Sequence, residues 1–106
     1  MAKYLLAYRG GNPPPEDPES QNKVMQAWIG WFGSLGSAVA DGGNPIGMTK
    51  SIAADGSVSD GGGADAISGY SVIEAESIDK AVELAKGCPH LQAGGTVEVG
   101  ETYNVM

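Results

Sequence analysis

The chain has 106 residues, 42% of them hydrophobic and 18% charged, which predicts one globular domain over residues 1–106. Thirteen acidic and six basic side chains give a net charge of −7, so we expect neither nucleic acid nor an anionic membrane as a partner. No stretch approaches the roughly 20 apolar residues of a spanning helix, and the amino terminus carries no secretory signal pattern, which predicts a cytoplasmic protein.

The first predicted strand covers residues 3–9. Its side chains alternate between two sides, with Tyr4, Leu6 and Tyr8 on one and Leu5 and Ala7 on the other. Because both sides carry large apolar groups, we expect both to be buried. Residues 10–15 form a loop in this interpretation, since their prolines lack N–H donors.

A long amphipathic helix is predicted next. Asp17 followed by Pro18 is a favourable helix start, because the carboxylate accepts an orphan N–H and proline has none to lose. An apolar stripe then recurs at three- and four-residue steps, formed by Val24, Met25, Trp28, Phe32, Leu35 and Val39. Three interior glycines, at 30, 33 and 36, each cost about 1 kcal/mol, so we expect either close packing against that backbone or tertiary contacts that override the cost. Residues 41–45 end the helix.

The remaining elements complete a β-α-β-β-α-β order. Asp55-Gly56 suits a tight hairpin turn between residues 47–54 and 57–59, and a strand follows over residues 69–76. Ser77 caps a helix that runs to residue 86, where Gly87 and Pro89 stop it. A last strand covers residues 96–99, with an edge segment to residue 105. The order predicts an α+β, ferredoxin-like fold, with an antiparallel sheet and both helices on one face.

The other sheet face leads to a prediction about assembly. Leu5 and Ala7 would lie on that face without a helix to cover them. Since an exposed apolar patch marks an interaction surface, we expect a homodimer through the sheet face.

Several motifs together resemble the YCII-related (DGPF-type) domain family. They are Asp60-Gly61, Gly69-Tyr70, Glu74-x-Glu76-Ser77-x-Asp79-x-Ala81 and Cys88-Pro89 followed by Gly94-Gly95-x-Val97-Glu98-Val99. The resemblance spans most of the chain and implies a dimeric α+β barrel with a pocket near the sheet. Most members have no assigned activity, some look like small enzymes with a histidine and aspartate pair, and one branch is linked to dehalogenating lyase chemistry. Gly62-Gly63 replaces the usual Pro-Phe, and the histidine usual near the first strand is absent.

Asp60 and His90 are the predicted catalytic pair. His90 is the only histidine of the chain, and a carboxylate beside an imidazole tunes acid and base chemistry. Each residue also has a structural interpretation. Asp60 suits a turn before glycine, and His90 suits the negative end of a helix.

Predicted substrate-binding residues are Tyr8, Arg9, Trp28 and Gly61. Arg9 would hold an anionic group, with a surface ion pair as the alternative. Trp28 would border the pocket or belong to the core, and the glycines from Gly61 onward lack the lysine of a phosphate loop. Cys88 follows a helix end and is interpreted as packing. One cysteine and one histidine cannot build a usual zinc site in one subunit, so no metal or other cofactor is predicted.

These features favour a protein that binds a small organic molecule, with the pocket lined by the first strand, the tryptophan helix and the Asp60 loop. The enzyme hypothesis is a cofactor-independent lyase- or hydrolase-like reaction that uses Asp60 and His90. The alternative is a non-catalytic binding or accessory module that acts as a homodimer. A purely structural assembly role is a third possibility, since one fold hosts many functions.

Overall fold

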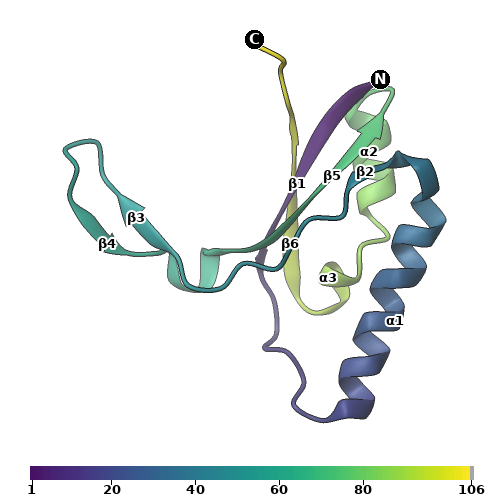
Figure 1. The fold of residues 1–106 in the computed structure, drawn as a ribbon, viewed down its shortest axis with the longest axis horizontal. Helices are drawn as coiled ribbons and strands as arrows, with labels where there is room; N and C mark the ends of the chain where they lie inside the picture. Colours follow the sequence, from purple (N-terminus) through teal and green to yellow (C-terminus); the bar gives the residue numbers. More distant parts are fainter. Residues whose placement is uncertain (106) are drawn as a thin grey trace.

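The computed structural model describes residues 1–105, except for the side chain of Ala64. Figure 1 shows a sheet with helices on one side and a hairpin that extends away from it. The elements in chain order are β1 (Ala2–Gly10), α1 (Pro18–Leu35), β2 (Val39–Asp41), β3 (Lys50–Ile52), β4 (Val58–Asp60), β5 (Ile67–Ala75), α2 (Ile78–Ala85), α3 (Pro89–Gln92) and β6 (Gly95–Glu101). Short 3₁₀ turns cover Gly36–Ala38 and Gly63–Asp65.

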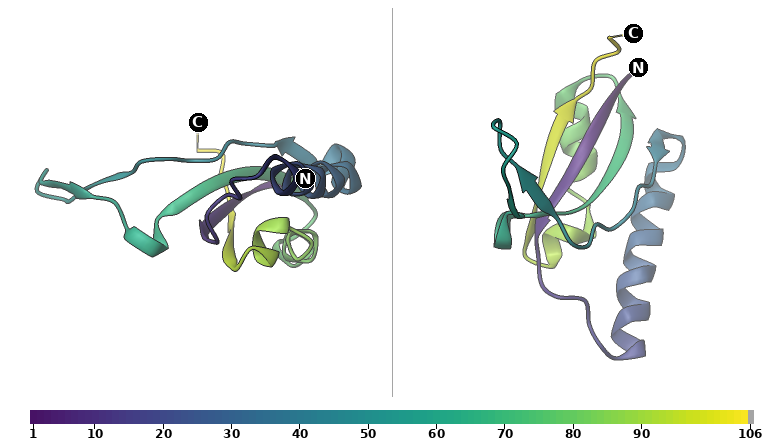
Figure 2. Two further views of the ribbon diagram at one scale, coloured as in Figure 1. Left: turned by 90° about the horizontal axis from the view of Figure 1, so that it is seen from below. Right: turned by 60° about the vertical axis from the view of Figure 1, so that its left-hand side comes forward.

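The main sheet has four antiparallel strands in the order β2-β5-β1-β6. β1 lies at the centre, where Leu6 faces Ser71 of β5 and Val99 of β6. α2 and α3 cover one face, and α1 lies beside the sheet and turns Trp31 toward the core (Figure 2). The predicted α+β class with a ferredoxin-like antiparallel sheet is therefore confirmed.

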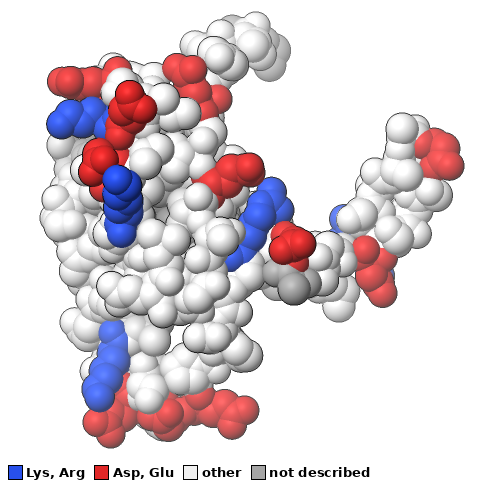
Figure 3. Space-filling model, turned by 180° about the vertical axis from the view of Figure 1, so that it is seen from behind, with Lys and Arg blue, Asp and Glu red and all other residues white. Residues whose placement is uncertain are grey.

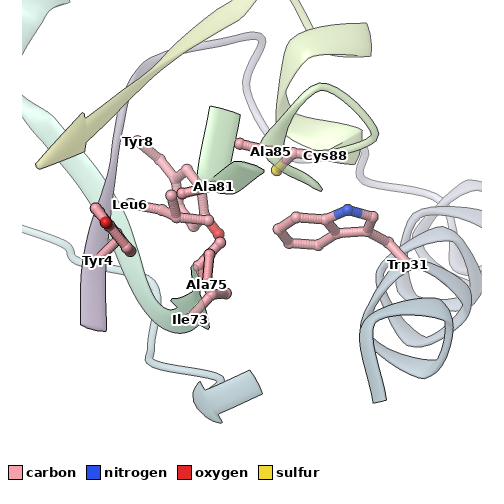
Figure 4. Packing of buried hydrophobic residues seen from close by; sticks show 9 residues of the cluster. All are labelled: Tyr4, Leu6, Tyr8, Trp31, Ile73, Ala75, Ala81, Ala85 and Cys88. Atoms are coloured by element: carbon pink, nitrogen blue, oxygen red, sulfur yellow. The ribbon is translucent and has the colours of Figure 1, made fainter. Parts of the chain in front are cut away.

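The hydrophobic core lies between the sheet and the helices (Figure 4). Its members are Tyr4, Leu6, Tyr8, Trp31, Ile73, Ala75, Ala81, Ala85 and Cys88. Trp31 reaches the core from α1, and its indole Nε1 donates to the Leu84 carbonyl of α2 at 3.2 Å. The predicted burial of β1 holds fully on this side. On the opposite face Ala7 is buried, whereas Leu5 stays 37% exposed.

α1 begins where it was predicted and ends earlier. The Asp17 carboxylate accepts from the Ser20 N–H at 2.8 Å, and Pro18 occupies the first turn. Gly36 adopts a φ of 57° and ends the helix, which favours glycine there. Val39 was predicted in the helical stripe, but it begins β2 and pairs with Ile73.

The outer side of α1 is uncovered within one chain. Nothing lies within 4 Å of a Cβ built at Gly30 or Gly33, so the close packing predicted there does not occur in a single chain. Met25 and Ile29 are 59% and 56% exposed on this side, and Val24, on the same stripe as Trp28, is also 46% exposed. Within residues 1–105, no helix is long and apolar enough to cross a membrane.

The predicted hairpin at Asp55-Gly56 forms, but it is not part of the main sheet. β3 and β4 make a separate two-stranded sheet, and the Asp55 carboxylate accepts from the Ser57 N–H at 2.9 Å in the turn. The second strand of the ferredoxin-like order is instead β2. The segment 42–47, which contains glycine and proline, separates β2 from the hairpin.

Two features of the carboxyl-terminal third also differ from the prediction. α2 ends at Ala85, before Gly87 and Pro89 as predicted, but Pro89 also starts a short helix, α3, that was not predicted, because proline fits the first turn. β6 ends at Glu101, after which the Thr102 N–H still donates to the Lys3 carbonyl at 3.0 Å. The predicted edge segment to residue 105 therefore stops short.

Candidate functional site

His90 lies in α3 and is fixed through one nitrogen of its ring. Nε2 lies 2.9 Å from the carbonyl oxygen of Arg9 at the end of β1. Since a carbonyl only accepts, Nε2 carries the proton of the neutral imidazole and Nδ1 is the basic nitrogen. No fully buried side-chain nitrogen or oxygen lacks a partner in the described part of the chain. Nδ1 makes no hydrogen bond there, and it is not fully buried although His90 as a whole is half-buried.

Two glycines hold the imidazole closely. A Cβ at Gly11, whose φ is +96°, would lie 2.8 Å from His90 Cε1. A Cβ at Gly95, the first residue of β6, would lie 2.5 Å from Cδ2 and Cε1 and would overlap Nε2. Both positions need glycine because the ring occupies the space of a side chain. The sequence prediction missed this role, because only Gly95 is near His90 in the sequence and Gly11 is distant from it.

Aromatic rings extend from His90 toward α1. The ring centroids of Tyr8 and His90 are 5.4 Å apart, and those of Tyr8 and Trp28 are also 5.4 Å apart, edge to face. Trp28 in turn lies 5.8 Å from Trp31. The structure thus brings together three predicted site residues, Tyr8, Trp28 and His90, with the Arg9 backbone.

A buried polar chain continues from Tyr8. Its hydroxyl donates to Ser71 Oγ at 2.8 Å, and Ser71 Oγ donates to the Gly42 carbonyl at 2.7 Å. Burial raises the pKa of the Tyr8 hydroxyl, and the bond to Ser71 lowers it by less. Burial also raises the pKa of the adjacent Cys88 thiol. Cys88 is 1% exposed, as its packing interpretation predicted.

Asp60 lies apart from this cluster within one chain. It is the last residue of β4 on the projecting hairpin (Figure 1), where its carboxylate accepts from Lys50 Nζ at 2.6 Å and is 91% exposed. Gly61 donates its N–H to the Thr49 carbonyl at 3.1 Å, and a Cβ at Gly61 would overlap Thr49 Oγ1. The acid/base pairing of Asp60 with His90 stays a prediction.

Arg9 makes surface contacts. Nη1 donates to the Asp65 carbonyl at 3.2 Å, and Nη2 lies 3.7 Å from Glu98 Oε1. This geometry matches the ion-pair alternative. Its role toward a substrate stays a prediction.

The charge and shape of the surface limit the kinds of site that the described residues can form. Figure 3 shows red acidic side chains at the edges of one face, with the few basic ones scattered among them. One open hollow of the surface lies between α2, α3 and β6, and another lies beside the two chain ends. Neither is lined by His90 or Asp60. Among residues 1–105, no three His, Cys, Asp or Glu side chains gather as a metal site would require.

Comparisons with solved structures find chains of similar overall shape. No family model matches the chain, and no curated protein matches it. A solved structure of 5-chloro-2-hydroxyhydroquinone dehydrochlorinase (TftG) from Burkholderia phenoliruptrix AC1100, in complex with 2,5-dihydroxybenzoquinone, is 19% identical. The match covers 95% of this chain and 93% of that chain, with a TM-score of 0.49. By its own strand order and packing, this chain is an α+β protein with a ferredoxin-like antiparallel sheet.

Proposed function

We propose that the protein binds a small organic molecule beside Tyr8, Trp28 and His90. The observation that carries the proposal is the state of the His90 imidazole. Nε2 is engaged by the Arg9 carbonyl at 2.9 Å, and Nδ1 is without a hydrogen-bond partner in the described chain and is not fully buried. A fixed ring with one free basic nitrogen is the arrangement that a general base requires.

The neighbours of His90 suit a flat or apolar ligand. Trp28 is half-buried and offers aromatic surface beside the buried Tyr8 ring, which lies 5.4 Å from both Trp28 and the imidazole, and aromatic rings favour stacked or edge contacts with similar groups. The net charge of −7 disfavours a polyanionic ligand. The proposed reaction is therefore proton transfer within a cofactor-independent, lyase- or hydrolase-like step on a small organic substrate.

In this proposal, Asp60 is a second acid/base group that a second copy of the chain would supply. In its own chain it forms an ion pair with Lys50, at 2.6 Å on the hairpin. A pair with His90 would need the hairpin of a second copy. His90 alone carries the catalytic part of the proposal.

The proposal includes a homodimer through the open sheet face. Leu5 and Val72 face each other there on β1 and β5, and Tyr70 lies opposite Ala7. Leu5 stays 37% exposed in one chain. Such a centre of apolar side chains on a sheet without helices favours contact with a second sheet.

The alternative is a non-catalytic binding or accessory module. It is favoured by the Lys50 partner of Asp60, because His90 then has no carboxylate to orient it. In that case the same cluster would bind a ligand without converting it.

A thermal-shift screen against small aromatic and carbonyl compounds tests the proposal, with turnover measured for each binder. His90→Gln keeps a side-chain amide that can donate to the Arg9 carbonyl while it removes the basic Nδ1, and His90→Ala removes both. We expect His90→Gln to retain binding and lose turnover. Asp60→Ala tests the second group. Binding without turnover in the wild-type protein favours the accessory module, and unchanged turnover in all three variants removes both residues from the mechanism.

A further inference from the structure

The hairpin of residues 48–61, called the arm below, has no support from the rest of its chain. Every residue from 50 to 60 is exposed. Figures 1 and 2 show the arm extending away from the sheet and helices. A two-stranded hairpin alone is marginally stable in water, so the arm needs a surface on which to lie.

The two sides of the arm differ in chemistry. Cross-strand pairing places Lys50 opposite Asp60, Ser51 opposite Ser59 and Ile52 opposite Val58. Because side chains alternate along a strand, Ile52 and Val58 share one side with the Lys50–Asp60 pair, and the two serines occupy the other. This is the pattern of a sheet with one buried and one solvated face. Yet Ile52 and Val58 are 73% and 63% exposed.

The accessible surface of the chain is too large for a compact monomer. It measures 7209 Å², whereas a folded monomer of 10.8 kDa exposes about 5,500 Å². The radius of gyration is 15.1 Å, against about 13 Å for a compact domain of this length. The excess of about 1,700 Å² per chain falls in the range that stable, obligate homodimers bury.

We propose that the arm of each copy lies on a second copy of this chain, with its Ile52 and Val58 side against that copy. The inference rests on the proposed homodimer and adds the arm as part of its interface. In a two-fold dimer each copy both donates an arm and receives one, so both excess surfaces are covered at once. The Lys50–Asp60 ion pair leaves that side of the arm without net charge, although the chain carries −7. Two acidic chains can therefore approach there.

Charge placed on each side of the arm tests the inference. Ile52→Asp and Val58→Asp put a carboxylate on the apolar side, and Ser51→Asp and Ser59→Asp put the same charge on the other side as matched controls. Dimer dissociation is measured by light scattering over a dilution series. We expect the apolar-side variants to weaken the dimer by about 100-fold or more, because an unpaired buried charge costs several kcal/mol. The controls should change it by less than about 5-fold, within the range of surface substitutions.

The outcomes separate the two proposals. A wild-type protein that is monomeric at micromolar concentration overturns both the homodimer and the arm contact. A wild-type dimer that all four variants leave unchanged overturns the arm contact alone, and the homodimer then stands through the sheet face. If the apolar-side variants and the control variants weaken the dimer equally, a contact through the Ile52 and Val58 side of the arm is also overturned.

Thiol labelling gives a second measurement that does not depend on dissociation. Ile52→Cys and Ser51→Cys are labelled with a maleimide in the intact protein, and the wild-type chain reports the background of Cys88, which is 1% exposed. We expect Ile52→Cys to react about 10-fold more slowly than Ser51→Cys in the dimer and at the same rate after dilution to monomers. Equal rates at both concentrations would contradict the arm contact.

Discussion

Gly95→Ala tests the placement of the His90 ring. A Cβ at this position would lie 2.5 Å from two ring carbons and would overlap Nε2, so the imidazole must move by more than an ångström. Its hydrogen bond to the Arg9 carbonyl, now 2.9 Å long, would then break. A lost hydrogen bond costs about 1 kcal/mol and overpacking adds a similar amount, so we expect a loss of about 1–3 kcal/mol in the free energy of unfolding.

Gly100→Ala is the matched control in the same strand. Nothing lies within 4 Å of a Cβ at Gly100, so this variant should be neutral or slightly stabilising. Urea unfolding followed by tryptophan fluorescence measures both variants, and NMR of the imidazole follows the position of the ring. If Gly95→Ala is as stable as Gly100→Ala and leaves the imidazole signals unchanged, the glycine cradle of His90 is refuted.

Three further predictions concern groups away from the His90 ring. Ser71→Ala should cost about 2–3 kcal/mol in urea unfolding, because it leaves both the Tyr8 hydroxyl and the Gly42 carbonyl without their partner, and a loss below about 0.5 kcal/mol would contradict the buried chain. Burial raises the pKa of Tyr8 and of Cys88 above their ordinary values of 10.0 and 9.0. The contribution of these two groups to the free energy of unfolding should therefore be fully present below pH 9. It should fall as pH rises further, by about 1.4 kcal/mol per pH unit for each group that only the unfolded chain has deprotonated; flat stability from pH 8 to 11 would count against this. Asp17→Ala should lower the midpoint of urea unfolding at pH 7 through loss of the α1 cap, and the difference from the wild-type protein should shrink in acid, because the hydrogen bond that lowers the Asp17 pKa is lost on protonation.

The parts of the fold that local chemistry determines were predicted from the sequence. Asp17 and Ser77 cap the two longer helices through their side chains, and Asp55-Gly56 forms the hairpin turn. Each of these depends on residues within three positions of one another. The alternation of Tyr4 and Leu6 likewise identified the buried side of β1.

Features that depend on distant contacts were not predicted. β2 forms because Val39 pairs with Ile73 on β5. Nothing near Val39 in the sequence distinguishes that strand from a continued helix. The site shows the same limit. Gly11 and Gly95 enclose His90 only because β1 and β6 are paired at Gly10 and Gly95, a contact between the two ends of the chain. The predicted position of Asp60 beside His90 had no such pairing to support it, and within one chain Asp60 meets Lys50.

The mass of the wild-type protein in solution is the most direct test of the account. We expect a particle of about twice 10.8 kDa by multi-angle light scattering at micromolar concentration, because one chain leaves the arm, the Leu5 face and the outer side of α1 uncovered. A single species of 10.8 kDa over the whole concentration range would contradict it.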